Sequence, residues 1–351
     1  MKYLMHNGLL ARLLPTMIMS FLVQPALGRP PSFVAATYGR AQHLVAVESG
    51  RRLNLICMGH GKPVVIFLSG LGSGSIDWRK VQPSIGQITE ACTYDRAGYG
   101  FSDPATRPSD ATQAVADLHA LIRAAGLPQP VMLVGHSLGG LYATLYAKTY
   151  PKSVAGMLLV DPAFEGQSKA FADVVGPRAA QQLAASQTQA LASVDRCAAL
   201  AKLGQLSLPA EANSDCLDNP PDADPDVHRE RNREAMSAGY ELAVGSEVQN
   251  ANITTPDGTT MNDMESAHIG ASLGAMPLVV LTRGDLNRLP GLTADEAARA
   301  EAAWKAGHDR VAALSSKGTN IVVPHSGHFI QLDQPGIVIT QLKHLIAKVQ
   351  S

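Results

Sequence analysis

The chain has 351 residues, of which 46% are hydrophobic and 17% are charged. This composition suits a protein with a large buried core and excludes an intrinsically disordered chain. The formal net charge is -1, so the sequence lacks the basic excess that nucleic-acid binding requires, and no nucleic-acid partner is expected. The length exceeds that of a typical single domain, and one large domain with an insertion accommodates it.

The first 28 residues have the pattern of an export signal. Lys2 and Arg12 supply positive charge, residues 13–23 are apolar, and residues 26–28 provide the small side chains of a cleavage site. The apolar stretch is shorter than the ~20 residues that span a bilayer, so we expect no stable membrane span. A periplasmic or secreted protein is therefore predicted, with an N-terminally membrane-anchored protein as the alternative.

Two apolar runs, at 53–58 and 64–68, predict strands that residues 59–63 join as a hairpin turn. The glycine-rich segment Ser69-Gly70-Leu71-Gly72-Ser73 follows the second strand. Trp78 comes next, and we expect it either to line a substrate pocket or to pack in the core.

Another strand begins at Cys92 and leads into the segment Tyr94-Asp95-Arg96-Ala97-Gly98-Tyr99-Gly100-Phe101-Ser102-Asp103. We expect Asp95 and Arg96 to form ion pairs or hydrogen bonds within this glycine turn and to take no part in chemistry. Residues 112–125 then have helical spacing, with apolar side chains on one face and Gly126 after the last turn.

The most informative segment is Gly135-His136-Ser137-Leu138-Gly139-Gly140, which follows the apolar run 131–134 and precedes a run of helix formers. It contains Gly-x-Ser-x-Gly between a predicted strand and a predicted helix, which is typical of a nucleophile elbow. Such a tight turn holds the serine in a strained backbone conformation and exposes its hydroxyl to a base. We expect His136 to serve in packing or in support of the site.

Residues 154–160 predict the next buried strand, which Asp161-Pro162 ends. Between 163 and 275 the valine- and isoleucine-rich runs disappear, and alanine, glutamine and acidic residues dominate segments of helical character. We interpret 163–275 as a cap inserted over the active site. Within it, the acidic and proline-rich stretch 211–230 is expected to be a solvated loop, since its acids lack the spacing of a calcium-binding EF-hand.

A serine hydroxyl needs a histidine base and a carboxylate that orients the histidine. The strand predicted at 277–283 ends in Asp285, and the strand predicted at 320–323 leads to His328. Asp161 is the alternative acid because it also ends a strand. His325 is the alternative base. Its ordinary interpretation is a partly exposed histidine in a loop, without a role in the reaction.

Taken together, these motifs resemble the α/β-hydrolase family, of the serine esterase type, from about Leu53 to the C-terminus. The chain order Ser137, Asp285, His328 agrees with that family. The resemblance implies a mostly parallel eight-stranded sheet with helices on both faces and a helical cap. The implied organisation is a signal peptide at 1–28, a core formed by 29–162 and 276–351, and the cap at 163–275.

The resemblance also implies a role for each site residue. His328 would take the proton of Ser137, and Asp285 would orient the histidine ring. The backbone N–H groups of Leu71 and Leu138 would form the oxyanion hole, where the negatively charged oxygen of the intermediate is stabilised. The sequence departs from many relatives at Ser69, where they carry a histidine. The backbone donor is kept despite this difference, but the resemblance does not specify the exact geometry of the loop.

The chain contains four cysteines, and an exported protein would pair them. In the sheet of this family, the strand that ends at Cys57 runs antiparallel to the strand that begins at Cys92, which implies a Cys57–Cys92 disulfide. Cys197 and Cys216 both fall in the cap and form the second expected pair. Their spacing resembles no zinc site.

We therefore expect an exported serine hydrolase that cleaves small-molecule carboxylic esters through an acyl-enzyme, with no cofactor or metal ion. An aminopeptidase with the same triad is one alternative, in which Glu241 or Glu247 of the cap would hold the substrate amine. The others are a perhydrolase that uses peroxide as acceptor and a non-catalytic binding protein on the same fold. Ser137 excludes haloalkane dehalogenases and epoxide hydrolases, which use aspartate at this position.

Overall fold

The structure is a computed structural model, and it describes residues 32–48, 50–207, 214–217, 224–270, 272–285 and 291–350. The export signal expected at 1–28 lies outside these residues. No helix in the described ranges has both the length and the apolar character needed to cross a bilayer.

The core of the protein is a sheet of eight strands in the order β1-β2-β4-β3-β5-β6-β7-β8. The strands are β1 His43–Glu48, β2 Arg51–Met58, β3 Val65–Leu68, β4 Ala91–Tyr94, β5 Val131–His136, β6 Val154–Val160, β7 Leu278–Arg283 and β8 Gly318–Val323. The pairs β1–β2 and β2–β4 are antiparallel, and the remaining pairs are parallel. The expected mostly parallel eight-stranded sheet is confirmed.

One local expectation is wrong. The strands β2 and β3 do not form a hairpin, because β4 lies between them and pairs with both. The connection at 59–64 therefore crosses over one strand position.

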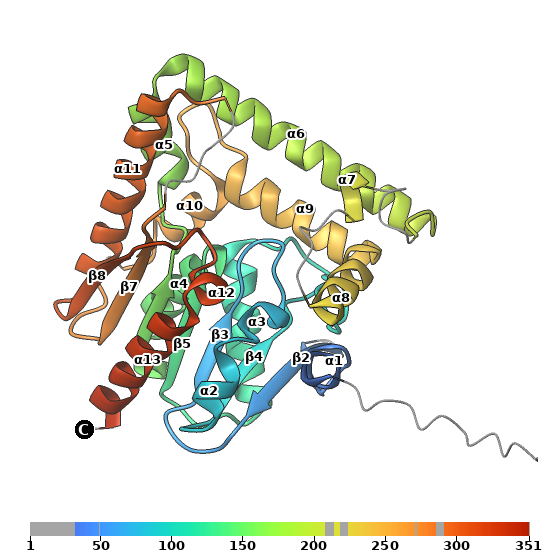
Figure 1. Cartoon of the computed structure of the whole chain (residues 1–351), viewed down its shortest axis with the longest axis vertical. Helices are drawn as coiled ribbons and strands as arrows, with labels where there is room; N and C mark the ends of the chain where they lie inside the picture. The colour runs from blue at the N-terminus through green and yellow to red at the C-terminus, as the bar shows by residue number, and fades with distance from the viewer. Residues whose placement is uncertain are drawn as a thin grey trace, which may run out of the picture. The chain divides into compact units, whose positions relative to one another are not determined.

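Helices cover both faces of the sheet, as Figure 1 shows. One face packs on α3, α4 and α11, and the other packs on α2 and α13. Side chains of β5 alternate between these two cores, because successive residues of a strand point to opposite faces. The helices outside the cap are α1 Phe33–Tyr38, α2 Gln82–Gly86, α3 Ala111–Ala124, α4 Leu138–Thr149, α11 Ala294–Ala313, α12 Ile330–Asp333 and α13 Pro335–Gln350, with short 3-10 turns at η1 Ser75–Trp78 and η2 Pro151–Ser153.

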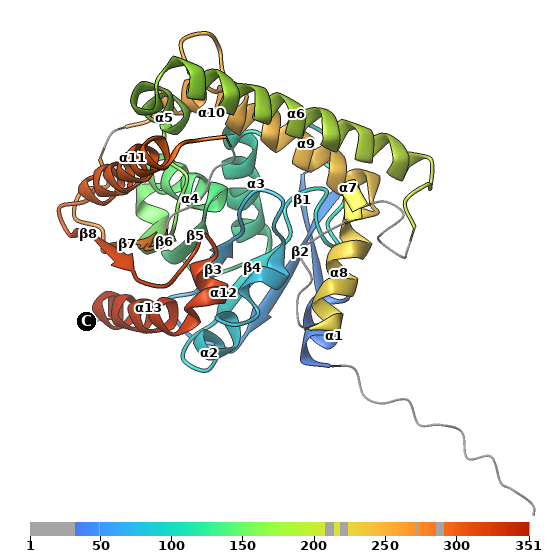
Figure 2. The same cartoon turned by 45° about the horizontal axis from the view of Figure 1, so that its top comes forward.

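The chain between β6 and β7 is helical, in the stretch interpreted as a cap. Its helices are α5 Gln167–Val175, α6 Pro177–Lys202, α7 Ser214–Leu217, α8 Pro225–Ala235, α9 Ala238–Asn252 and α10 Met261–Ser266. The long helices α6 and α9 pack against each other above the sheet (Figure 2). We refer to α5 to α10 as the cap helices. The loop expected at 211–230 is wrong at Ser214–Leu217, which form α7, and from Pro225 onward, where α8 begins. Residues 211–213 and 218–223 are not among those described.

Both expected disulfides are present. Cys57 of β2 lies directly opposite Cys92 of β4 in the antiparallel register, with Cα atoms 4.1 Å apart. Cys197 of α6 is joined to Cys216 of α7, with Cα atoms 5.5 Å apart. The first disulfide links two strands of the sheet, and the second fixes the short helix α7 to the end of α6. Disulfides persist in oxidising compartments, so both bonds favour such a location for the protein.

Candidate active site

A cavity of about 410 Å³ lies between the strand ends and the cap helices. Ser137, which follows β5, and His328, which follows β8, both line it. The cap contributes Phe171 of α5, Leu183 of α6 and Ala251 of α9. The serine and the histidine identified from the sequence therefore face one cavity, whose lining is partly apolar.

Ser137 occupies a strained turn between β5 and α4. Its backbone has φ 50° and ψ -123°, in a region that residues with side chains rarely adopt. Small neighbours are required here, because a Cβ added at Gly139 would lie 2.4 Å from the carbonyl oxygen of Leu68. The turn therefore has the strained geometry expected of the elbow that the Gly-x-Ser-x-Gly segment predicts.

His328 is oriented by a carboxylate, and that carboxylate is Asp161. The ring Nδ1 of His328 lies 2.6 Å from Oδ2 of Asp161. Because an ionised carboxylate only accepts hydrogen bonds, Nδ1 carries the proton. This tautomer leaves Nε2 of His328 as the ring nitrogen able to accept a proton within the cavity.

Asp161 is completely buried and its charge is compensated from several directions. Its Oδ1 accepts hydrogen bonds from the backbone N–H of Arg283 and from Nε1 of Trp304, and its Oδ2 accepts one from the guanidinium of Arg283. Burial alone would raise the pKa of Asp161, but the hydrogen bond from His328 and the charge of Arg283 outweigh it and hold the pKa below its usual range. The carboxylate is therefore ionised beside the histidine.

The expectation that Asp285 orients His328 is wrong. Asp285 follows β7 in an exposed bend, and its backbone N–H donates to the carbonyl of Ser326. Asp161 follows β6, which pairs directly with β5, the strand that carries the elbow. The backbone of Asp161 also has a positive φ of 43°, a second strained position in the same site.

Two other histidines lie near the site in sequence but have different surroundings. His136 is buried, and its Nε2 donates to the backbone carbonyl of His328 at 3.0 Å. Burial and the neighbouring His328 lower the pKa of His136 to about 3, so the ring is neutral. It supports the loop that carries the catalytic histidine candidate. His325, the alternative base, is exposed on the surface.

The two expected oxyanion donors both border the cavity. Leu138 begins α4, and the first N–H groups of a helix have no partner inside it. Leu71 lies in the loop after β3, which passes so close to the elbow that a Cβ at Gly70 would lie 3.0 Å from Cβ of Ser137. Both residues thus lie close to the serine.

Asp95 and Trp78 serve the fold. Asp95 accepts hydrogen bonds from the side chain of Asn54 and the backbone of Phe101, as expected of a structural role. Trp78 is fully buried against Phe67 and its Nε1 donates to Ser69, so of the two roles expected for it the core position is the one observed.

The cap acids proposed to hold a substrate amine do not line the cavity. Glu247 is buried and forms an ion pair with Arg96. Glu241 is also buried, which raises its pKa to about 7. Two other carboxylates, Asp263 and Glu301, do border the cavity, but Asp263 caps helix α10 and Glu301 pairs with Arg283.

Sequence reasoning missed three residues of the site. Arg283 and Trp304 surround Asp161, and Glu301 holds the other end of the Arg283 guanidinium at 2.7 Å. Arg283 lies over the indole ring of Trp304 at 4.5 Å. Both Trp304 and Glu301 come from α11, about 140 residues beyond Asp161 in the chain, and no local motif connects them.

Within the described ranges, one group of side chains is close enough to share a metal ion, namely Cys57, Glu90 and Cys92. Its two sulfurs are joined in the disulfide, so neither is available as a thiolate ligand.

Known proteins resemble this chain over different shares of its length. It is 24% identical to the uncharacterized protein YqjL of Bacillus subtilis over 274 residues, which cover 78% of this chain and 79% of that protein. It is 34% identical to the mouse (lyso)-N-acylphosphatidylethanolamine lipase over 102 residues, which cover only 28% of this chain and 30% of the lipase.

Among solved structures, a thermophilic esterase from Thermogutta terrifontis is similar with a TM-score of 0.55 and 20% identity, covering 89% of this chain and 100% of the esterase. At that identity the likeness concerns the fold. Residues 65–341 match the alpha/beta hydrolase family. The matched range includes the elbow, Asp161 and His328. The chain therefore belongs to the alpha/beta hydrolase family.

Proposed function

We propose that this hydrolase is a serine esterase that cleaves carboxylic esters of small molecules through an acyl-enzyme. Ser137 is the nucleophile, His328 the general base and acid, and Asp161 the orienting carboxylate. The observation that carries the proposal is the 2.6 Å hydrogen bond between His328 and Asp161 beside a strained serine in one cavity.

In the proposed reaction, Oγ of Ser137 attacks the ester carbonyl carbon while Nε2 of His328 takes the hydroxyl proton. The tetrahedral intermediate collapses as the carbon–oxygen bond to the alcohol breaks, and His328 gives its proton to the departing alkoxide. Water then attacks the acyl-enzyme by the same steps in reverse, which releases the carboxylic acid and restores Ser137. The ionised Asp161 stabilises the imidazolium that forms in each half-reaction.

The developing oxyanion would be bound by the backbone N–H groups of Leu71 and Leu138. Donors of this kind are fixed before the reaction begins, so they stabilise the transition state without reorganising. The proposed chemistry needs no cofactor or metal ion.

The wall of the cavity favours an ester with an apolar group. Phe164, Phe171 and Trp304 contribute aromatic surface, while Gln167 and Gln187 are among its polar side chains. Among the alternatives, the aminopeptidase is disfavoured because Glu241 and Glu247 do not border the cavity. The two disulfides support the proposal that the protein is exported.

A substrate panel tests this proposal. Purified protein is assayed on p-nitrophenyl esters of increasing acyl length and on aminoacyl p-nitroanilides, with and without a metal chelator. We expect turnover of the short esters, no effect of the chelator, and labelling of Ser137 by a fluorophosphonate probe. The Ser137→Ala variant should lose both the ester turnover and the labelling by the probe.

The other outcomes separate the alternatives. Cleavage of the nitroanilides but not of the esters would favour the peptidase, and faster turnover with peroxide as acceptor would favour the perhydrolase. A folded wild type that is inert to esters and probe alike would favour a binding protein. Ester turnover that survives Ser137→Ala would place the chemistry elsewhere.

A further inference from the structure

The loop after β3, which carries Leu71, is held by side chains that the proposed reaction does not use. The guanidinium of Arg96 donates to the backbone carbonyl of Ser69 at 2.7 Å and to that of Gly70 at 2.8 Å. These two carbonyls immediately precede the proposed oxyanion donor in the chain.

The orientation of one peptide group makes this contact consequential. The carbonyl of Gly70 and the N–H of Leu71 belong to the same peptide, which is trans and planar, so they point in opposite directions. When Arg96 binds the carbonyl on one side of the loop, the N–H of Leu71 must face the other side. In the described part of the chain, the hydrogen bonds that hold the loop do not use this N–H.

Glycine at position 70 makes such a constraint necessary. The close approach of the loop to Ser137 excludes a side chain there. A glycine, however, adopts backbone conformations that other residues do not, so the peptide that follows it can rotate at low cost. A flipped peptide would present the Gly70 carbonyl to the cavity instead of the Leu71 N–H, and it would repel an oxyanion.

Arg96 is itself fixed by a carboxylate from the cap. Nε of Arg96 lies 2.6 Å from Oε1 of Glu247 in helix α9, and a second nitrogen lies 2.9 Å from Oε2. Glu247 is 1% exposed and also accepts a hydrogen bond from the Tyr99 hydroxyl at 2.6 Å. The guanidinium plane is therefore locked between the carboxylate and the two loop carbonyls.

A second connection joins the same cap helix to the loop. The Tyr240 hydroxyl, also from α9, donates to the carbonyl of Gly72 at 2.9 Å, and the Gly72 N–H donates to the Tyr99 hydroxyl at 3.2 Å. Helix α9 thus binds the carbonyl of Gly72 directly, through Tyr240. It holds the carbonyls of Ser69 and Gly70 indirectly, through Arg96.

We propose that the Arg96–Glu247 ion pair is a positioning device for the oxyanion hole, through which the cap holds the Leu71 N–H toward Ser137. This inference rests on the proposed esterase function. In this arrangement the cap both covers the site and positions one of its donors. Removing Glu247 would free the guanidinium that keeps the Gly70–Leu71 peptide in place.

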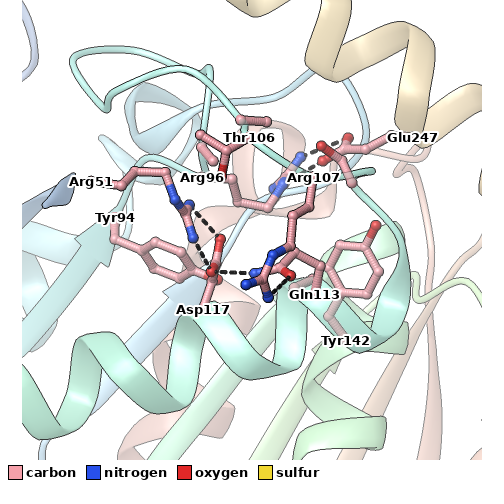
Figure 3. Close-up of a pocket in the computed structure, with 13 residues that line it drawn as sticks. Arg51, Tyr94, Arg96, Thr106, Arg107, Gln113, Asp117, Tyr142 and Glu247 are labelled. Atoms are coloured by element: carbon pink, nitrogen blue, oxygen red, sulfur yellow. Dashed lines mark hydrogen bonds and ion pairs between the residues drawn. The ribbon is translucent and has the colours of Figure 1, made fainter. Parts of the chain in front are cut away.

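The chain supplies a matched control in the Arg51–Asp117 pair. Figure 3 shows both pairs at the same small pocket, with Arg51 and Asp117 on one side and Arg96 and Glu247 on the other. Arg51 and Asp117 form a two-bonded ion pair that is also largely buried. The hydrogen bonds of their side chains join them to each other and to Gln113, away from the loop of Leu71.

The experiment compares Glu247→Gln and Arg96→Lys with the control Asp117→Asn. For each variant, kcat and KM are measured on an activated ester, together with the affinities for an alkyl boronic acid and for the carboxylic acid product. The boronic acid forms a tetrahedral adduct on the serine and so reports the oxyanion hole, whereas the product reports ground-state binding. Melting temperatures report stability.

We expect Glu247→Gln to lower kcat about 10- to 100-fold with KM within about twofold, as for a displaced oxyanion donor. Affinity for the boronic acid should fall by a similar factor, and affinity for the product should not change. Arg96→Lys should act in the same direction, because an ammonium cannot bind both carbonyls and both carboxylate oxygens. Asp117→Asn should lower the melting temperature and leave kcat within about twofold of the wild type.

Equal losses of kcat in Glu247→Gln and Asp117→Asn, in proportion to lost stability, would overturn the positioning role. Unchanged kcat and boronic acid affinity in folded Arg96→Lys would also overturn it, while leaving the esterase proposal intact if the wild type hydrolyses esters. A wild type that is inert to esters and to the fluorophosphonate would instead overturn the proposed function, and the positioning role with it.

Discussion

Nδ1 of His328 and Oδ2 of Asp161 are 2.6 Å apart, although 167 residues separate the two in the chain. The contact forms because β6, β7 and β8 are consecutive parallel strands, so the segments that carry Asp161 and His328 leave the sheet at the same edge. The elbow leaves at this edge too, because β5 pairs with β6. Arg283 and Trp304 then bind the remaining acceptor positions of the carboxylate.

This relationship predicts opposite results for the two aspartates considered from the sequence. Asp161→Asn should lower kcat by about three to four orders of magnitude, because an amide cannot hold the histidine in the productive tautomer or stabilise the imidazolium. Asp285→Asn should stay within about threefold of the wild type, since an exposed substitution away from the site has little effect. Steady-state kinetics on an activated ester measure both.

Circular dichroism of both variants guards against misfolding as the cause. If Asp285→Asn loses activity as severely as Asp161→Asn while folded, Asp285 acts in the reaction and our assignment of the acid is wrong.

The sequence predicts the nucleophile and the base better than the acid, for a physical reason. Ser137 is specified by a local motif, since only small neighbours permit the elbow, and His328 lies in the short loop after the last strand, β8. Asp161 and Asp285 both end neighbouring parallel strands, so local pattern does not separate them. What selects Asp161 is its burial among the donors of Arg283 and Trp304, a tertiary arrangement that no short segment encodes.

The same limit applies to the cap. Its helical character follows from composition, and the positions of strands in the core follow from their apolar runs. The pairing of Glu247 with Arg96 does not, because it joins helix α9 to a loop 151 residues away in the chain. The predicted hairpin is wrong for the same reason. The strand β4, which comes later in the chain, lies between β2 and β3 in the sheet.

The disulfides make a chemical prediction. Proteolysis of the unreduced protein should release one peptide pair joined by Cys57–Cys92 and another joined by Cys197–Cys216, both identified by mass spectrometry. Reduction should lower the melting temperature. Each bond restricts the unfolded chain and so stabilises the folded state by about 3 to 4 kcal/mol for loops of this size. Four thiols that react with an alkylating reagent in the folded, unreduced protein would contradict both bonds.

A buried acid in the cap predicts how stability depends on pH. Glu234 of α8 is 8% exposed, and its Oε1 accepts a hydrogen bond from the backbone N–H of Gly100 at 2.6 Å. Burial, together with the negative charge of Asp95, raises the pKa of Glu234 from 4.5 to about 8. Between these two pKa values the folded protein keeps a proton that the unfolded chain has lost.

The sign of the effect follows from proton linkage. Because the folded state binds more protons than the unfolded state in this range, the free energy of unfolding falls as pH rises, by at most about 1.4 kcal/mol per pH unit for one group. Glu234→Gln removes this contribution while it keeps an oxygen that accepts the Gly100 hydrogen bond. The variant should therefore lose less stability than the wild type between about pH 5 and about pH 9 in urea unfolding.

Glu296→Gln provides the control of opposite sign. The backbone N–H of Thr293 and the charge of Arg178 lower the pKa of Glu296 to about 2, so its stabilising contribution is present above the unfolded pKa of 4.5 and is lost as pH falls toward 2. Glu296→Gln should thus be less stable than the wild type at neutral pH, and the difference should vanish in acid.

Parallel pH profiles for Glu234→Gln and the wild type would contradict the prediction for Glu234. They would mean that Glu234 is already ionised in the folded protein at neutral pH.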